Sequence, residues 1–128
     1  MDRRFYERAK IGVMSNFIIK DNPFGCKEFN GVIENISEGG VLIRADMSQF
    51  GHVIDTITEG TEVVFQTYDE YELLGQPKAD VVSGEVIVLR VDEDEDGKLL
   101  GCKFKRLTSD LNEYVQNKKL SIYVKGLR

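Results

Sequence analysis

Three arginines near the start of the chain have the residue type and spacing to hold an anionic group. Arg4 and Arg8 are four residues apart, and Arg3 directly precedes them. A guanidinium binds phosphate through two N–H groups at once, stacks on a nucleobase and pairs with the O6 and N7 edge of guanine. Arg4 and Arg8 share one side of the segment whether it is extended, at roughly 13 Å apart, or helical, at one turn apart. The pattern predicts a two-pronged cationic clamp, although a solvated charged terminus is the commoner explanation of so short a motif.

A second polar group follows about thirty residues later, where Asn35, Ser37, Gly39 and Gly40 form an Asn-x-Ser-x-Gly-Gly pattern. The Asn35 amide offers a donor and an acceptor, and the Ser37 hydroxyl rotates to suit its partner. If the preceding strand continues, these two side chains share a face. The two glycines allow a tight turn and let backbone N–H groups approach a ligand. An ordinary turn explains the same residues when they are taken alone.

Alternating apolar residues predict the strands that would position these groups. We expect strands over residues 11–19, 29–36, 62–67, 82–91 and 99–107, with a further one that begins at Val41. Gly31 suggests a bulge in the second strand. The expected fold is mainly β, a six-stranded antiparallel barrel, because closure removes exposed edges and six strands are few for two sheets. Five phenylalanines are expected in the barrel core or at its rim: Phe24, Phe29, Phe50, Phe65 and Phe104.

The last twenty residues follow a helical pattern instead. Thr108 or Ser109 can cap a helix in which Leu111, Tyr114 and Val115 share one face. Lys118 and Lys119 suit its negative C-terminal end. Residues 120–124 either extend this helix or form a last strand. We therefore expect one domain over 1–128, with an arm (1–10), a barrel (11–107) and a C-terminal helix (108–125).

Two connections have unusual composition. Residues 68–79, from Tyr68 to Ala79, form a long link that can hold a helical turn or an extended hairpin and can carry a partner contact. Asp92 to Asp96 is an unbroken acidic run, which predicts a solvated hairpin tip closed by Gly97. A calcium loop is the alternative, but the ligand spacing of known loops is missing.

Composition excludes several classes of function. The net charge is −5, so general attraction to nucleic acid is not expected, although residues 1–10 hold four basic residues against two acidic ones. No run approaches the roughly 20 apolar residues of a membrane span, and no secretory signal is expected. Cys26 and Cys102 suggest reduced thiols of a cytoplasmic protein rather than a metal site. A lone His52 and the lack of a phosphate-binding loop indicate that the chain is not an enzyme.

The two motifs, in this order and before a strand-rich remainder, resemble the PilZ domain, the bacterial receptor module for cyclic di-GMP. Both together are far rarer by chance than either alone. The resemblance extends over further segments, at residues 34–43, 60–65, 84–90 and 100–104. It implies a six-stranded barrel with a C-terminal α-helix and a flexible N-terminal arm.

The resemblance also implies which residues bind cyclic di-GMP. These are the arm residues Arg4 and Arg8 and the turn residues Asn35, Ser37 and Gly40, with Gly39 contributing backbone. Arg3 sits where the family varies, and an arginine there is compatible with two stacked ligand molecules per protomer. Asn35 stands where aspartate is commoner in the family. The protein is then a monomer or a ligand-dependent dimer that signals to an unidentified protein in motility, biofilm or virulence control.

The sequence is compatible with two other functions. The first is a PilZ-like adaptor that binds a protein without any nucleotide. The second is a small barrel that binds RNA or single-stranded DNA through its arm, which the acidic total disfavours.

Overall fold

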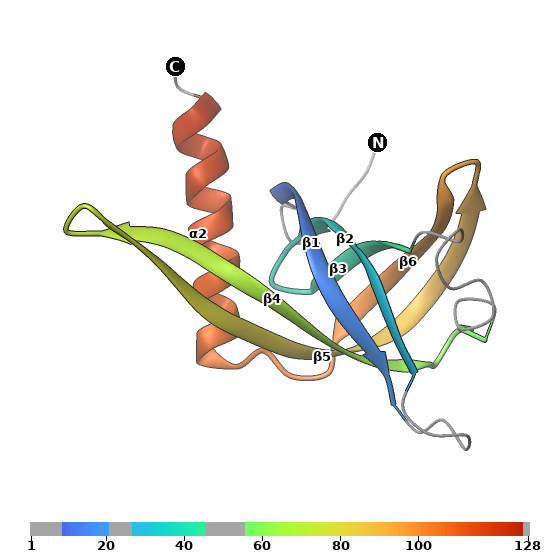
Figure 1. Ribbon diagram of the computed structural model, residues 1–128. Coiled ribbons are helices and arrows are strands. Elements are labelled where there is room, and N and C mark those ends of the chain that lie inside the picture. The colour runs from blue at the N-terminus through green and yellow to red at the C-terminus, as the bar shows by residue number, and fades with distance from the viewer. Residues whose placement is uncertain (1–8, 21–26, 46–55, 127–128) are drawn as a thin grey trace.

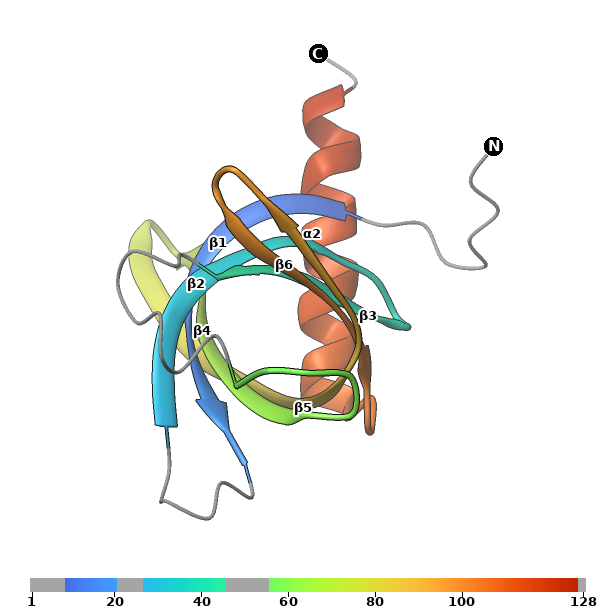
Figure 2. The same ribbon diagram turned by 90° about the vertical axis from the view of Figure 1, so that its right-hand side faces the viewer.

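The computed structural model describes residues 9–20, 27–45 and 56–126, which form one ring of strands followed by a helix (Figures 1 and 2). The strands are β1 (Ala9–Ile19), β2 (Lys27–Ile36), β3 (Gly40–Ala45), β4 (Glu62–Leu73), β5 (Gln76–Asp94) and β6 (Gly97–Phe104), and the helix is α2 (Ser109–Gly126). All neighbours pair antiparallel in the order β1-β2-β3-β6-β5-β4, and β4 closes on β1. The predicted fold class is confirmed.

Inward-facing residues of all six strands fill the ring. Phe17 and Phe29 are fully buried, and their rings stack with centroids 5.0 Å apart. Phe65 is also buried, and Phe104 packs against the core, so the predictions for Phe29, Phe65 and Phe104 are confirmed. Phe24 and Phe50 lie outside the described residues. Burial of a large aromatic side chain contributes about 2 kcal/mol or more, so these rings contribute much of the apolar stabilisation.

The register shifts at three places in the described strands, and two of these bulges lie in β1 and β2 while the third lies in β5 between Val88 and Arg90. The bulge in β1 lies between Lys10 and Val13, where Gly12 has φ +58°, and the bulge in β2 lies between Ile33 and Asn35. The predicted bulge at Gly31 was wrong, because that residue pairs in regular register. A Cβ at Gly31 would lie 2.6 Å from the Arg44 carbonyl oxygen, so glycine is needed there for close packing.

The segment from Tyr68 to Ala79 is an extended hairpin, one of the two predicted alternatives. β4 runs to Leu73, β5 begins at Gln76, and the two strands project well beyond the barrel (Figure 1). The two loop residues, Leu74 and Gly75, have φ values of 53° and 78°. Positive φ at both loop residues is typical of a type I′ turn, which matches the twist of the strands.

Replacing Leu74 by asparagine should stabilise the protein by about 0.5–1 kcal/mol, because a leucine with positive φ is strained and asparagine tolerates that conformation. Leu74 is 96% exposed, so little packing is lost. Chemical denaturation would measure the change. Leu73→Asn is the matched control, since it makes the same side-chain change in strand geometry and should give no gain.

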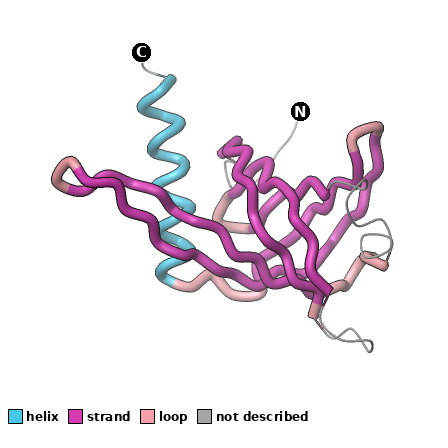
Figure 3. Tube along the Cα trace, viewed as in Figure 1, coloured by secondary structure: helices cyan, strands magenta, loops and turns pink. Residues whose placement is uncertain are grey.

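The C-terminal segment is helical to Gly126, so residues 120–124 extend the helix. Thr108 caps it, because its Oγ1 accepts a hydrogen bond from the Leu111 amide at 3.2 Å. Leu111, Tyr114 and Val115 are buried, as predicted, and α2 contacts β1 and β5 beside the ring (Figure 3). The expectation that the two lysines lie at the helix end was wrong. The helix continues past them, and they pair with acidic residues of the barrel instead.

The acidic run forms the tip of the β5–β6 hairpin, as predicted, with Gly97 at φ +134°. Within the described ranges, no group of three or more potential metal ligands comes together, and no helix there is long and apolar enough to cross a membrane. Cys102 is a buried free thiol, and burial raises its pKa to about 12.

Candidate functional site

The second sequence motif forms the turn between β2 and β3. The Ser37 amide donates to the Gly40 carbonyl oxygen at 2.9 Å, which closes a two-residue loop. The Gly39 amide donates to the Ser37 hydroxyl oxygen at 3.2 Å, and Ser37 is only 4% exposed. The Ser37 side chain therefore stabilises the turn from within.

Gly40 lies where β3 meets β6. A Cβ on Gly40 would lie 1.9 Å from the Cys102 carbonyl oxygen, so no larger residue fits without movement of the backbone. The Phe104 amide also donates to the Gly39 carbonyl oxygen at 3.1 Å. These contacts show that both glycines have a structural role, at the contact between the turn and β6. Their predicted approach to a ligand stays a prediction.

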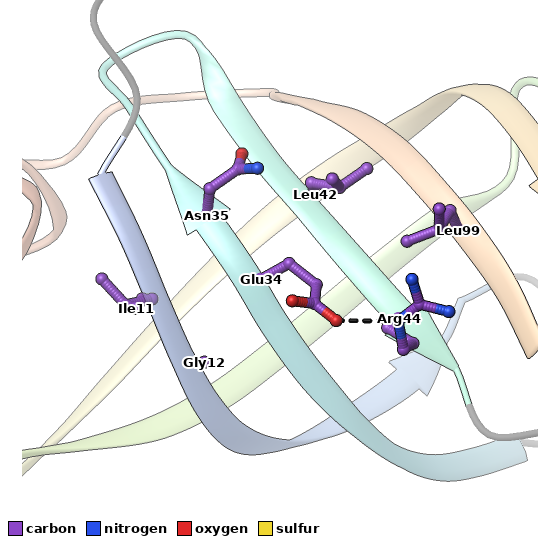
Figure 4. Close-up of a pocket in the computed structure, with 7 residues that line it drawn as sticks. All are labelled: Ile11, Gly12, Glu34, Asn35, Leu42, Arg44 and Leu99. Carbon is purple, nitrogen blue, oxygen red and sulfur yellow. Dashed lines mark hydrogen bonds and ion pairs between the residues drawn. The ribbon is translucent and has the colours of Figure 1, made fainter. Parts of the chain in front are cut away.

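Asn35 borders a hollow of about 370 Å³ on the outside of the barrel (Figure 4). Its lining consists of Ile11, Gly12, Glu34, Asn35, Leu42, Arg44 and Leu99. The bulge in β2 places Glu34 and Asn35, neighbours in sequence, in the same hollow. Ser37 follows the end of β2 and is not among the residues that line the hollow, so its predicted role beside Asn35 stays a prediction.

The Asn35 Oδ1 atom is buried and has no hydrogen-bond partner among the described residues. A buried acceptor without a partner is uncommon, because desolvation without a hydrogen bond costs about 1–3 kcal/mol. The hollow beside it is large enough to admit a donor group from a bound molecule. Glu38 Oε2 in the same turn is also buried without a partner in the described part of the chain, but of these two residues only Asn35 lines the hollow.

Arg44 is a site residue that the sequence patterns missed. Its Nε donates to Glu34 Oε1 at 2.8 Å, and an Nη donates to Asp94 Oδ1 at 2.9 Å (Figure 4 draws the Glu34 bond). The hydrogen bonds that Arg44 donates to Asp94 and then to Glu34 raise the pKa of Arg44, and the bond from Arg44 holds the pKa of Asp94 below its usual value. The only sequence signal was a charged residue within the apolar strand that starts at Val41.

The start of β1 lies directly beside this turn. Ala9 pairs with Ile36, and Lys10 pairs with Asn35. Arg3, Arg4 and Arg8 themselves lie outside the described residues, so the clamp stays a prediction.

The C-terminal helix is bonded to the same turn through Glu38. Lys119 Nζ and Gln116 Nε2 each donate to Glu38 Oε1 at 2.8 Å. Burial acts to raise the pKa of Glu38, but the bonds from Lys119 and Gln116 outweigh it, so this pKa lies below its ordinary value. The turn and the helix are thereby held together.

Replacing Lys119 by methionine should destabilise the protein by about 1 kcal/mol at pH 7, because Glu38 loses a charged donor while the apolar stem is kept. The depressed pKa of Glu38 stabilises the fold above its unfolded-state pKa of about 4.3, and this contribution disappears as pH falls through the folded-state pKa. The difference between variant and wild type should therefore shrink below about pH 4. Urea denaturation across pH would measure it.

Lys103→Met is the matched control, since Lys103 is exposed on β6 and should show neither the loss nor its pH dependence. An equal loss at pH 3 and pH 7 would contradict the assignment to Glu38.

Comparison with known proteins gives one family and several similar folds. The PilZ domain family model matches residues 2–118, whereas no curated protein matches the chain. Among solved structures, the Bacillus subtilis inhibitor of motility MotI/DgrA has a TM-score of 0.70 at 15% identity, over 98% of this chain and 54% of that one.

Two further structures are similar to this chain. The PilZ domain of YcgR from Escherichia coli, solved with c-di-GMP, has a TM-score of 0.67 at 14% identity, over 98% of this chain and 95% of that one. The MrkH–c-di-GMP complex from K. pneumonia has a TM-score of 0.65 at 16% identity, over 100% and 55%. The chain thus spans about half the length of MotI/DgrA and MrkH, and at these identities the likeness shows the fold.

Proposed function

Because the chain belongs to the PilZ domain family, a non-catalytic receptor family that usually binds cyclic di-GMP, we propose that it is a cyclic di-GMP receptor. Ligand binding would order or reposition residues 1–10 and so change the surface offered to a protein partner. The output is regulatory, in control of motility, biofilm formation or virulence, and the protein acts in the cytoplasm.

The unpartnered Asn35 Oδ1 is the observation that carries the proposal. Asn35 lines an open hollow of about 370 Å³, and its strand neighbour across the ladder is Lys10, directly after the arm. The exocyclic amino group of guanine is a donor that such an oxygen would accept. A ligand held here is within reach of an arm that carries Arg4 and Arg8.

Charge supports the same arrangement. The whole chain is acidic, but residues 1–10 carry four basic residues against two acidic ones. Screening limits the reach of exposed charges to about 8–10 Å, so the local excess governs attraction of the two ligand phosphates. Arg3 adds a third guanidinium, which would suit two stacked ligand molecules and, through them, a ligand-dependent dimer.

Calorimetric titration with cyclic di-GMP tests the proposal. We expect saturable binding, a rise in melting temperature, and a stoichiometry of one or two that also decides the role of Arg3. GMP and cyclic di-AMP are the controls, and both should bind more weakly. Absence of heat and of any thermal shift at high micromolar cyclic di-GMP would leave the nucleotide-independent adaptor, which the projecting β4–β5 hairpin favours.

A further inference from the structure

The projecting part of the β4–β5 hairpin has an unpaired edge. The register between β1 and β4 ends at Asn16 and Gln66. Beyond Gln66, β4 pairs only with β5 among the described residues, as far as Leu73 (Figure 1). An open strand edge presents N–H and C=O groups that a further strand can pair with.

The hairpin geometry tells which groups face outward. A two-residue loop makes Leu73 and Gln76 a hydrogen-bonded pair, and such pairs alternate along an antiparallel ladder. The backbone N–H and C=O groups of Tyr68, Glu70 and Glu72 therefore point away from β5. The same alternation directs Glu62 outward, and its carbonyl oxygen does accept a bond from the Lys20 amide at 2.9 Å.

The opposite edge of the hairpin is less suited to pairing. Pro77 lies across from Glu72, at a position whose N–H would point outward from β5. Proline has no N–H, so the β5 edge lacks a hydrogen-bond donor at this position, whereas the β4 edge keeps all of its backbone N–H donors.

An apolar surface lies beside the open β4 edge. Met14, Tyr68 and Val81 are 66%, 63% and 60% exposed, and they line a second hollow of about 370 Å³ where β1 and β4 diverge. Tyr68 and Val81 are cross-strand partners and share the outer face of the hairpin with Glu70. The apolar stems of basic residues on a strand laid along β4 would therefore pack against them while the charged ends reach Glu70.

The charge of the hairpin indicates which kind of partner strand would bind to the β4 edge. Residues 68–81 carry four acidic side chains, Asp69, Glu70, Glu72 and Asp80, against Lys78 alone. An antiparallel copy of the chain centred on this edge would set Glu70 against its own counterpart, which is unfavourable. Lysine or arginine at alternate positions would instead be complementary.

We propose that the β4 edge at residues 68–72 binds an extended segment of a partner protein, in which basic residues alternate with apolar ones, as an added strand. This names the surface by which the proposed receptor would meet its partner, and to that extent rests on the proposed function. α2 links the two regions, since Lys119 bonds Glu38 in the β2–β3 turn and Lys118 Nζ lies 3.9 Å from Asp69 Oδ1 in the hairpin.

A synthetic peptide of alternating lysine and valine serves as the probe, and its glutamate–valine counterpart is the control. We expect the basic peptide to bind at least about tenfold more tightly by fluorescence anisotropy, with an affinity that falls as salt rises. Hydrogen exchange of wild-type protein should slow at the amides of Tyr68, Glu70 and Glu72. All titrations omit cyclic di-GMP, so a failed nucleotide titration leaves this result readable.

Proline variants then identify the edge. Glu70→Pro removes one outward N–H without touching a hairpin bond and should weaken binding about tenfold relative to Glu70→Ala, which removes the same charge. Ala79→Pro makes the same backbone change at the residue opposite and should leave affinity within about twofold.

Three results would overturn the proposal. The first is equal binding of both peptides, and the second is equal loss in both proline variants. The third is a dimer of the free protein that Glu70→Pro disrupts, which would assign the edge to a second copy. If Glu70→Pro does not fold, hydrogen exchange of the wild-type protein tests the proposal instead. Unchanged exchange at the amides of Tyr68, Glu70 and Glu72 on addition of the basic peptide would then overturn it.

Discussion

Replacing Arg4 or Arg8 by alanine is expected to weaken cyclic di-GMP binding by roughly tenfold to a hundredfold each, because a charge-assisted hydrogen bond contributes about 1.5–3 kcal/mol. A guanidinium that also stacks on guanine would place the loss at the upper end of this range. Calorimetric titration measures it, and the melting temperature without ligand should be unchanged, since both residues precede β1. The double variant should retain no measurable binding.

The control for this prediction is Arg106→Ala. Arg106 is exposed, precedes α2 and lies outside the candidate site, so its loss changes net charge equally without touching the clamp. Wild-type affinity for cyclic di-GMP in both arm variants would contradict the proposed clamp. An equal loss of affinity in all three variants would mean that the net charge of the protein, and not a specific contact, causes the effect.

The fold could be predicted from the sequence because apolar residues recur clearly, at every second position in the strands and at every third or fourth position in the helix. Alternation in residues 11–19 and 62–67 predicted strands that the structure contains, and the spacing of Leu111, Tyr114 and Val115 predicted the buried face of α2. The 68–79 segment was ambiguous for a physical reason. With Gly75 and Pro77 near its middle and no regular alternation of apolar residues, it has no pattern that distinguishes a ribbon from a helical turn.

The site was predicted less completely, because one residue type can satisfy different requirements. Gly31 was taken for a bulge, yet it accommodates the Arg44 backbone, and the bulge falls next to Asn35. Arg44 itself was missed because its partner Asp94 is 50 residues away in sequence, and no local pattern connects two strands that far apart. The hollow beside Asn35 exists only once these strands are side by side.

Gly40 is the sharpest case of this ambiguity, and its replacement by alanine is expected to destabilise the protein by about 3 kcal/mol, a fall in melting temperature of roughly 10 °C. The new Cβ would lie 1.9 Å from the Cys102 carbonyl oxygen and 2.9 Å from Lys103 Cα. Both are backbone atoms, which cannot rotate away as a side-chain end would. β3 must therefore separate from β6 at the turn.

Gly101→Ala is the matched control on β6, because the nearest atom to its Cβ is Arg90 Cβ at an ordinary 3.7 Å. Its effect should stay within about 0.5 kcal/mol, and it can stabilise by restricting the unfolded chain. Thermal denaturation of both variants, followed by titration at a temperature where each is folded, separates the two roles of Gly40. A Gly40→Ala protein as stable as wild type that loses cyclic di-GMP would mean that the ligand, and not β6, requires the glycine.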